Sequence, residues 1–172
     1  GQSSTATLMG QNTKFTVHGK EIPGKVERRK EIAQICMMHP NTFVAQTSCA
    51  MTNHFYKSIM AANEYDGPAV VSVYTTCQPE HGVGDNMAMQ QSKLAVDTRT
   101  FPVLIYDPRK GDKIAQRLSL QGNPSEKTDF FVEPKTNEVY DFIRFARTEG
   151  RFSKHFDKDG NPSETLLKAK QE

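Results

Sequence analysis

The apolar positions of this chain fall into short blocks whose spacing alternates between that of strands and that of helices. Residues 42–47, 70–74 and 101–106 are apolar runs bounded by turn residues, and they predict three strands. Residues 52–62 and 86–96 carry apolar side chains at helical spacing. The order strand, helix, strand, helix, strand is typical of parallel crossovers. We therefore expect an α/β fold with a three-layer, mostly parallel sheet.

The segments before this pattern are more polar. Residues 1–24 are rich in Gly, Ser, Thr and Gln and predict a long loop. Residues 25–39 place an apolar stripe opposite a cluster of charged side chains, and they predict an amphipathic helix that ends at Pro40.

After residue 109 the periodicity weakens. A turn-rich stretch is followed by a predicted helix capped by Thr136 or Asn137 and by a last helix that Pro162 opens. We therefore divide the chain into an α/β part, 1–108, and an extension with helices, 109–172, which we expect to pack on the same domain or on a partner.

Three strands are few for an α/β sheet, since sheets average about 5–6 strands. The edge of the sheet must then be completed by residues outside this chain or by another chain. The chain also lacks an initial Met, and its Gly/Ser/Thr start suggests a segment of a larger protein, although a boundary introduced by processing or cloning would give the same start.

Charge and composition narrow the functional classes. The 22 basic and 20 acidic residues are interspersed and give a net charge of only +2, which argues against binding to nucleic acid. No apolar run approaches the ~20 residues of a membrane helix, and the start does not resemble a signal peptide, so we expect a cytoplasmic protein without a membrane anchor. Cys36, Cys49 and Cys77 are odd in number and far apart, which argues against a disulfide framework and against a complete metal site within this chain.

Cys77 has the most informative setting of the three cysteines. It directly follows the apolar run at 70–74, which predicts a buried parallel strand, and ligands of α/β sheets lie beyond the carboxyl ends of such strands. Gly82 and Gly84 would let the following loop approach a ligand closely. A buried core cysteine is the alternative, and Cys36 is best explained by such packing. His81 could form a catalytic dyad with Cys77, or it could simply order the loop.

Taken together, several segments resemble one family. The resemblance is to the C-terminal part of the thiamine-diphosphate-binding region of 2-oxoacid:ferredoxin oxidoreductases, of which pyruvate:ferredoxin oxidoreductase is the best-known member. The segments that carry it are Gly1–Thr7, Phe43–Ser48, Gly67–Cys77, His81-Gly82, Ala95-Val96 and Phe101–Arg109. No single motif is decisive, but their order along the chain is specific.

The resemblance implies roles for four residues. Gly1, Gln2 and Ser3 would border the bound thiamine diphosphate and its Mg²⁺, whose ligands would lie upstream. Cys77 matches the isolated fourth thiolate of the [4Fe-4S] cluster nearest the thiamine, and clusters held by cysteines far apart in sequence are common. The loop before His81 is longer than expected for the pyruvate enzymes, so the resemblance leaves the substrate open.

The resemblance also implies an activity. The enzyme would oxidatively decarboxylate a 2-oxoacid, most simply pyruvate, to acyl-CoA and CO₂, and pass the electrons through [4Fe-4S] clusters to ferredoxin. The partners would be other subunits or domains of the same oxidoreductase, ferredoxin, the 2-oxoacid and coenzyme A, in an oligomer, and this chain would hold no complete catalytic set. A non-catalytic α/β interaction module is the alternative, and a cysteine hydrolase is a more distant one.

Overall fold

The computed structural model describes residues 7–12, 24–125 and 127–171. Its main sheet has the strand order β2-β1-β3-β4. The strands are β1 (Phe43–Ser48), β2 (Ala69–Tyr74), β3 (Leu104–Tyr106) and β4 (Leu118–Ser119). β1 and β2 run parallel, whereas the β1/β3 and β3/β4 pairs are antiparallel.

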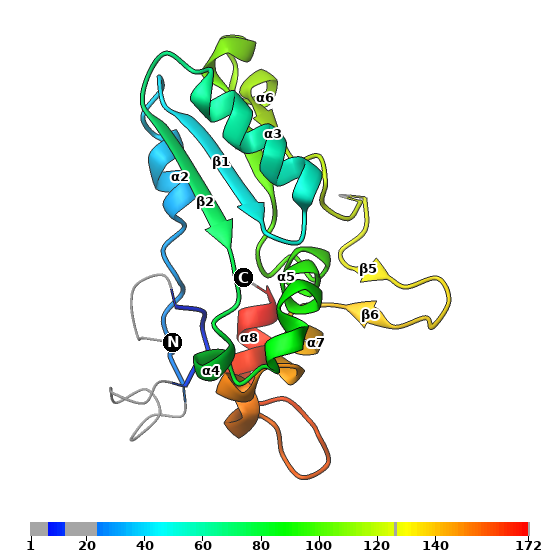
Figure 1. Ribbon diagram of the computed structural model, residues 1–172. Helices are drawn as coiled ribbons and strands as arrows, with labels where there is room; N and C mark the ends of the chain where they lie inside the picture. The colour runs from blue at the N-terminus through cyan, green and yellow to red at the C-terminus, as the bar shows by residue number, and fades with distance from the viewer. Residues whose placement is uncertain (1–6, 13–23, 126, 172) are drawn as a thin grey trace.

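Two helices cover opposite faces of the sheet (Figure 1). Successive side chains of a strand point to opposite faces, and Val44 on β1 packs with Ala33 of α2 (Ile32–Met37). On the other face, Thr47 Oγ1 lies 2.9 Å from Nδ1 of His54 in α3 (Thr52–Asn63). Helix, sheet and helix therefore form three layers around the fully buried strand β1.

A second core lies beyond the carboxyl ends of β1 and β2, where several helices gather (Figure 1). These are α5 (Ala88–Asp97), α7 (Phe142–Arg147), the 3₁₀-helix η3 (Gly150–His155) and α8 (Glu164–Gln171). Aromatic rings fill this second core, and the Phe142 and Phe152 rings pack edge to face with their centroids 5.7 Å apart. Ala95 belongs to the same cluster, so both parts of the chain contribute to one core.

The remaining elements are short. They are α4 (Gln78–His81), η1 (Asp85–Met87), η2 (Pro108–Lys110), α6 (Ile114–Arg117), and the strands β5 (Phe131–Val132) and β6 (Val139–Tyr140), which form a separate antiparallel hairpin. Among the described residues, no helix is both long and apolar enough to span a bilayer.

The α/β class is confirmed, but the expectation of a third parallel strand is wrong. In a parallel crossover, the helix runs back along one face of the sheet to the end at which the preceding strand began. The helix before β3, α5, instead stays at the carboxyl end of β1, where Ser48 Oγ donates to the carbonyl of Ser92 at 3.0 Å. The chain therefore re-enters the sheet from the end at which it left, and β3 runs antiparallel.

The expectation that β2 is buried is also wrong for this chain. Among the described residues β2 has a single neighbouring strand, β1, and the residues of β2 are half-buried or exposed. Val73 is 39% exposed. An apolar run predicts burial on both sides only when a second neighbour is present.

Two helix predictions need correction. The predicted helix at 25–39 is confined to α2, and residues 25–31 before it are not helical. The helix after residue 136 begins later than expected, since β6 occupies its start. Asp141, rather than Thr136 or Asn137, caps α7 by accepting from the backbone N–H of Arg144 at 2.9 Å.

Candidate functional site

Cys77 lies at the point where the chain leaves β2 and enters α4. It is the N-cap residue of α4 in an extended backbone conformation, and its side chain is exposed. The alternative of a packed core cysteine is therefore wrong in this chain. The thiol is available to a ligand or partner that covers this end of the sheet.

The residue before Cys77 is anchored to α5. Thr76 is buried, its Oγ1 lies 3.3 Å from Ser92 Oγ, and it donates to the carbonyl of Ala88 at 3.4 Å. Cys49, which follows β1, lies against the same serine with its Sγ 3.2 Å from Ser92 Oγ. The carboxyl ends of β1 and β2 are thus fixed to one helix by a small group of hydroxyl and thiol side chains.

The segment after Cys77 is held by α4 and by a close backbone contact. The backbone N–H of His81 donates to the carbonyl of Cys77 at 2.8 Å, and Gly82 ends α4 with a positive φ of 66°. Gly150 donates to the carbonyl of Gly82 at 3.3 Å. A Cβ on Gly82 would lie 2.8 Å from Gly150 Cα, so this approach requires glycine at 82, whereas a Cβ on Gly150 would make a tight contact of 3.3 Å with Gly82 Cα.

A buried carboxylate, that of Glu149, lies next to this contact. Its Oε1 accepts from Gln91 Nε2 at 3.0 Å, and its Oε2 accepts from Arg151 Nε. Arg151 Nη1 in turn donates to Gln11 Oε1 at 2.6 Å. Burial raises the pKa of Glu149, and the Arg151 charge opposes that rise.

His81 faces this carboxylate. Its ring is buried, with Nδ1 3.7 Å from Glu149 Oε1. Burial, together with the positive charge of Arg151, lowers the pKa of His81 to about 3. The imidazole is therefore neutral near pH 7, and the 3.7 Å separation is a polar contact rather than an ion pair. A ring held against Glu149 fits the loop-ordering role better than a dyad with Cys77.

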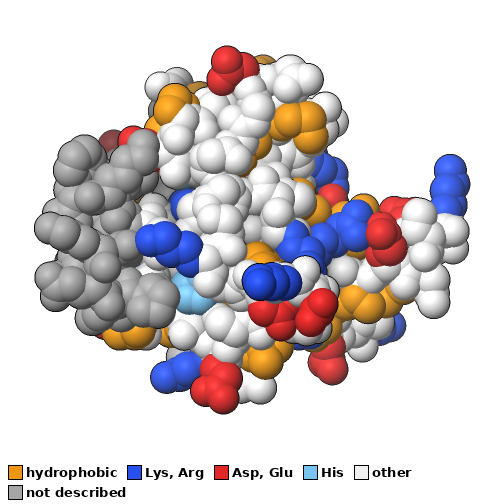
Figure 2. Space-filling view, turned by 90° about the horizontal axis from the view of Figure 1, so that it is seen from below, with side chains coloured by type: hydrophobic (Ala, Val, Ile, Leu, Met, Phe, Trp, Pro, Cys, Tyr) orange, Lys and Arg blue, Asp and Glu red, His pale blue; other side chains and the backbone are white. Residues whose placement is uncertain are grey.

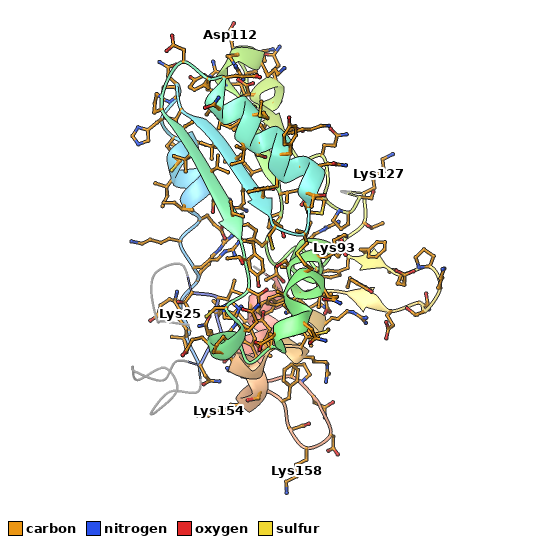
Figure 3. All side chains as sticks on the ribbon, in the orientation of Figure 1. Lys25, Lys93, Asp112, Lys127, Lys154 and Lys158 are labelled. Carbon is orange, nitrogen blue, oxygen red and sulfur yellow. The ribbon has the colours of Figure 1, made fainter. Side chains whose placement is uncertain are left out.

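Lys93 on α5 is exposed, and Lys158 lies at the tip of the loop between η3 and α8 (Figure 3). On the end of the molecule seen in Figure 2, basic and acidic side chains of the described residues lie next to one another. That end of the molecule therefore carries both signs of charge on its surface.

The other residues singled out from the sequence are less informative. Gly1, Gln2 and Ser3 lie outside the described residues. Cys36 is half-buried and packs against the cluster under α2, as expected. Within residues 7–12, 24–125 and 127–171, no three His, Cys, Asp or Glu side chains are grouped so that they could hold a metal ion. The exposed Cys77 fits one ligand of a shared cluster but not a complete site.

Sequence reasoning missed Glu149, Arg151, Gln91 and Ser92. Gln91 and Ser92 look like ordinary polar positions of an amphipathic helix, and Glu149 and Arg151 follow a helix end where charged residues are common. The only available signal was Gly150 between two charged residues, which indicates a close backbone approach but not its partner.

Comparisons with known proteins show which proteins the chain is similar to. No family model matches the chain. Pyruvate synthase subunit PorB of Thermotoga maritima is 29% identical over 153 residues, which cover 89% of this chain and 41% of that subunit. Pyruvate-flavodoxin oxidoreductase of Rhodospirillum rubrum is 31% identical over 173 residues, covering 100% of this chain but 13% of that protein. Pyruvate:ferredoxin oxidoreductase of Moorella thermoacetica is 28% identical over 110 residues, covering 63% of this chain and 9% of that protein.

These relatives share one class: the chain is similar to 2-oxoacid oxidoreductases that are built from several subunits or from one long polypeptide. More particularly, it matches a region of the pyruvate:ferredoxin oxidoreductase type, and the resemblance seen in the sequence is confirmed. The chain spans less than half the length of each of these relatives.

Proposed function

We propose that this chain is part of an enzyme that oxidatively decarboxylates a 2-oxoacid, pyruvate in the first instance, to acyl-CoA and CO₂. The electrons pass through [4Fe-4S] clusters to ferredoxin. Support comes from the relatives, which are pyruvate synthase and pyruvate oxidoreductases by name, and from the match of Cys77 to the cluster-binding cysteine that the resemblance implies.

The observation that carries the proposal is the position of the Cys77 thiol. It is exposed at the carboxyl end of a strand, in a loop whose two ends are fixed to α5 and to Gly150. One exposed cysteine suits a cluster whose other three ligands come from outside the described residues. When bound, thiamine diphosphate supplies the carbanion chemistry and the cluster accepts single electrons. The part of this chain is to hold one thiolate in place.

Further roles belong to the same proposal. Gly1, Gln2 and Ser3 border the thiamine diphosphate and its Mg²⁺. The chain functions as an α/β part, 1–108, with an extension, 109–172, inside a cytoplasmic oligomer whose other subunits or domains supply the remaining ligands. Ferredoxin, the 2-oxoacid and coenzyme A are its partners in catalysis.

The test is Cys77→Ser in the complete enzyme, purified without oxygen from its source. We expect electron transfer to ferredoxin to be lost while most thiamine diphosphate binding is kept, because serine is a poor ligand for iron. Cys36→Ser, in a half-buried cysteine away from the loop, is the matched control and should leave electron transfer unchanged. An iron–sulfur signal in Cys77→Ser identical to that of the wild type would refute the ligand assignment.

A non-catalytic α/β interaction module is the second candidate. The exposed apolar edge of β2 favours it, because such an edge is typical of a surface that another chain covers. Iron and sulfide analysis of the native complex separates the two. Stoichiometric iron and sulfide that depend on Cys77 support the enzyme, and a complex free of both supports the module.

A further inference from the structure

The carboxylate of Glu149 lies between the two segments that flank Cys77. Its side chain is fully buried. Tyr74, three residues before Cys77, places its hydroxyl 3.5 Å from Glu149 Oε1. His81, four residues after Cys77, places Nδ1 3.7 Å from the same oxygen. This oxygen accepts a long hydrogen bond from Tyr74 before the loop and lies near His81 after it, without a hydrogen bond to that ring.

A buried charge at this position is costly, and the protein offsets the cost with a second buried charge. Arg151 donates to Glu149 and is itself fixed by Gln11, and Gln91 of α5 donates a further hydrogen bond to the carboxylate. A buried ion pair contributes little net stability compared with well-packed apolar side chains. A role in fixing geometry accounts better for its presence beside this loop.

The backbone between the two charged residues reaches the same loop. Gly150 packs on Gly82 and donates to its carbonyl, so any displacement of Glu149 or Arg151 moves the backbone that supports the end of α4. On the other side, Thr76 is tied to Ser92. Cys77 is thus an exposed residue between two buried contacts. One is the contact of Thr76 with Ser92, and the other is made by the Glu149–Arg151 segment, which belongs to the C-terminal extension.

We propose that Glu149 and Arg151 are positioning residues that hold the Cys77 loop in the geometry required for its thiolate to ligate an iron–sulfur cluster. The inference rests on the proposed function and deepens it. Neither residue contacts the cluster, and both act through Tyr74, His81 and Gly82. The extension after residue 109 therefore sets the shape of a ligand loop that belongs to the α/β part.

The test uses Glu149→Gln in the complete enzyme, purified without oxygen. Glutamine keeps the size of the side chain but removes the charge that holds Arg151. We expect amide hydrogen exchange in residues 76–83 to rise by about tenfold or more, while exchange in β1 stays at the wild-type rate. We also expect the electron paramagnetic resonance spectrum and the reduction potential of the cluster nearest the thiamine to change. Arg151→Lys keeps the positive charge but loses the planar guanidinium group with its several N–H donors, and it should show smaller changes of the same kind.

Asp112→Asn is the matched control, since Asp112 is an exposed carboxylate at the opposite end of the molecule (Figure 3). It should change neither the exchange nor the spectrum. Unchanged exchange at 76–83 in Glu149→Gln overturns the proposal. Faster exchange with an unaltered spectrum and potential also overturns it, because the residues would then be merely structural. If Glu149→Gln does not fold, Arg151→Lys decides by the same two measurements.

Failure of the proposed function is recognised separately. In that case Cys77→Ser leaves the iron–sulfur signal unchanged, whereas the exchange of the loop in Glu149→Gln still rises. A signal that is lost in Cys77→Ser but unaltered in Glu149→Gln instead refutes the positioning role alone.

Discussion

At the scale of single residues, Gly82 is the position where the Cys77 loop tolerates least change. Its φ of 66° is a conformation that side chains rarely adopt, and a Cβ would press on the backbone of Gly150. We expect Gly82→Ala to lower the free energy of unfolding by about 1–3 kcal/mol, measured by urea denaturation.

Gly84 offers a control in the same loop. Its φ is −61°, and a Cβ there would meet only the side chains of Asn86 and Met87. Gly84→Ala should change the unfolding free energy by no more than about 0.5 kcal/mol. Equal losses in the two variants would show that the contact between Gly82 and Gly150 has no special weight.

His155 gives a prediction about pH. The ring is buried with Nδ1 2.7 Å from Ser163 Oγ, and burial lowers its pKa below the usual value, against a smaller opposing effect of the Gly10 backbone. Above about pH 6.5 the histidine is neutral in both folded and unfolded chains. Below that pH the unfolded chain takes up the proton first, so stability falls as the pH falls toward the lowered folded pKa.

The variant His155→Gln removes this titration while it keeps a polar group near Ser163. Between pH 7.5 and 5.5, we expect its unfolding free energy to decline less steeply than that of the wild type, by at most about 1 kcal/mol per pH unit. Urea denaturation at several pH values measures both slopes. His81 and His54, whose pKa values are also lowered by burial, remain in both proteins and cancel in the comparison. Identical slopes would contradict a neutral buried His155.

At the scale of elements, α8 packs one of its faces against the second core. Leu166 is fully buried among the aromatic rings of that core, whereas the next residue, Leu167, is 46% exposed. Leu166→Ala removes buried methyl groups and leaves a cavity, and it should cost about 2–5 kcal/mol of unfolding free energy. Leu167→Ala should cost no more than about 0.5 kcal/mol. Thermal or urea unfolding of the two variants checks which face of α8 is packed, and similar losses would contradict the packing seen here.

The elements also show which parts of the fold can be predicted from sequence. α3, β1 and β2 were predicted within one or two residues, because their apolar periodicity and their bounding turns are local signals. The direction of β3 could not be predicted, since it depends on where α5 packs, and α5 contacts both β1, 40 or more residues before it, and α7, more than 40 residues after it. α7 was placed too early because Asp141 and Thr136 are both good N-cap residues, and only the pairing of β6 with β5 decides between them.

The candidate site, too, could be predicted from the sequence only in part. The sequence identified Cys77 and its position after a strand, both of which are local features. The loop contacts Ser92, Glu149 and Gly150, and Gln91 and Arg151 support Glu149 in turn. No pattern in a single sequence connects these segments. A buried carboxylate with an arginine two residues away looks the same in sequence as two exposed charges at a helix end.

At the scale of the whole molecule, β2 is an edge strand, and among the described residues no strand pairs with its outer side. Tyr56 and Ile59 on α3 are exposed, and so are Ile32 and Ile35 on α2. Both helices contact β2, so apolar side chains are exposed on the helices of both faces of the sheet. An exposed apolar edge of this kind is a template for pairing with another strand. Because the matched relatives are more than twice as long as this chain, we expect β2 to pair with a further strand of the complete enzyme.

Val73→Asp tests this expectation, because Val73 is already 39% exposed in the chain by itself. A carboxylate there should change the stability of the isolated chain by no more than about 1 kcal/mol, yet it should impair assembly of the complete enzyme, where the same side chain would be buried without a partner. Co-purification and size-exclusion chromatography of the tagged complex measure assembly. Val139→Asp places the same charge on a valine that is 46% exposed on the separate β6 hairpin, and it should leave assembly intact. If both variants assemble as well as the wild type, β2 is a free edge, and the sheet of this chain does not continue into the rest of the enzyme.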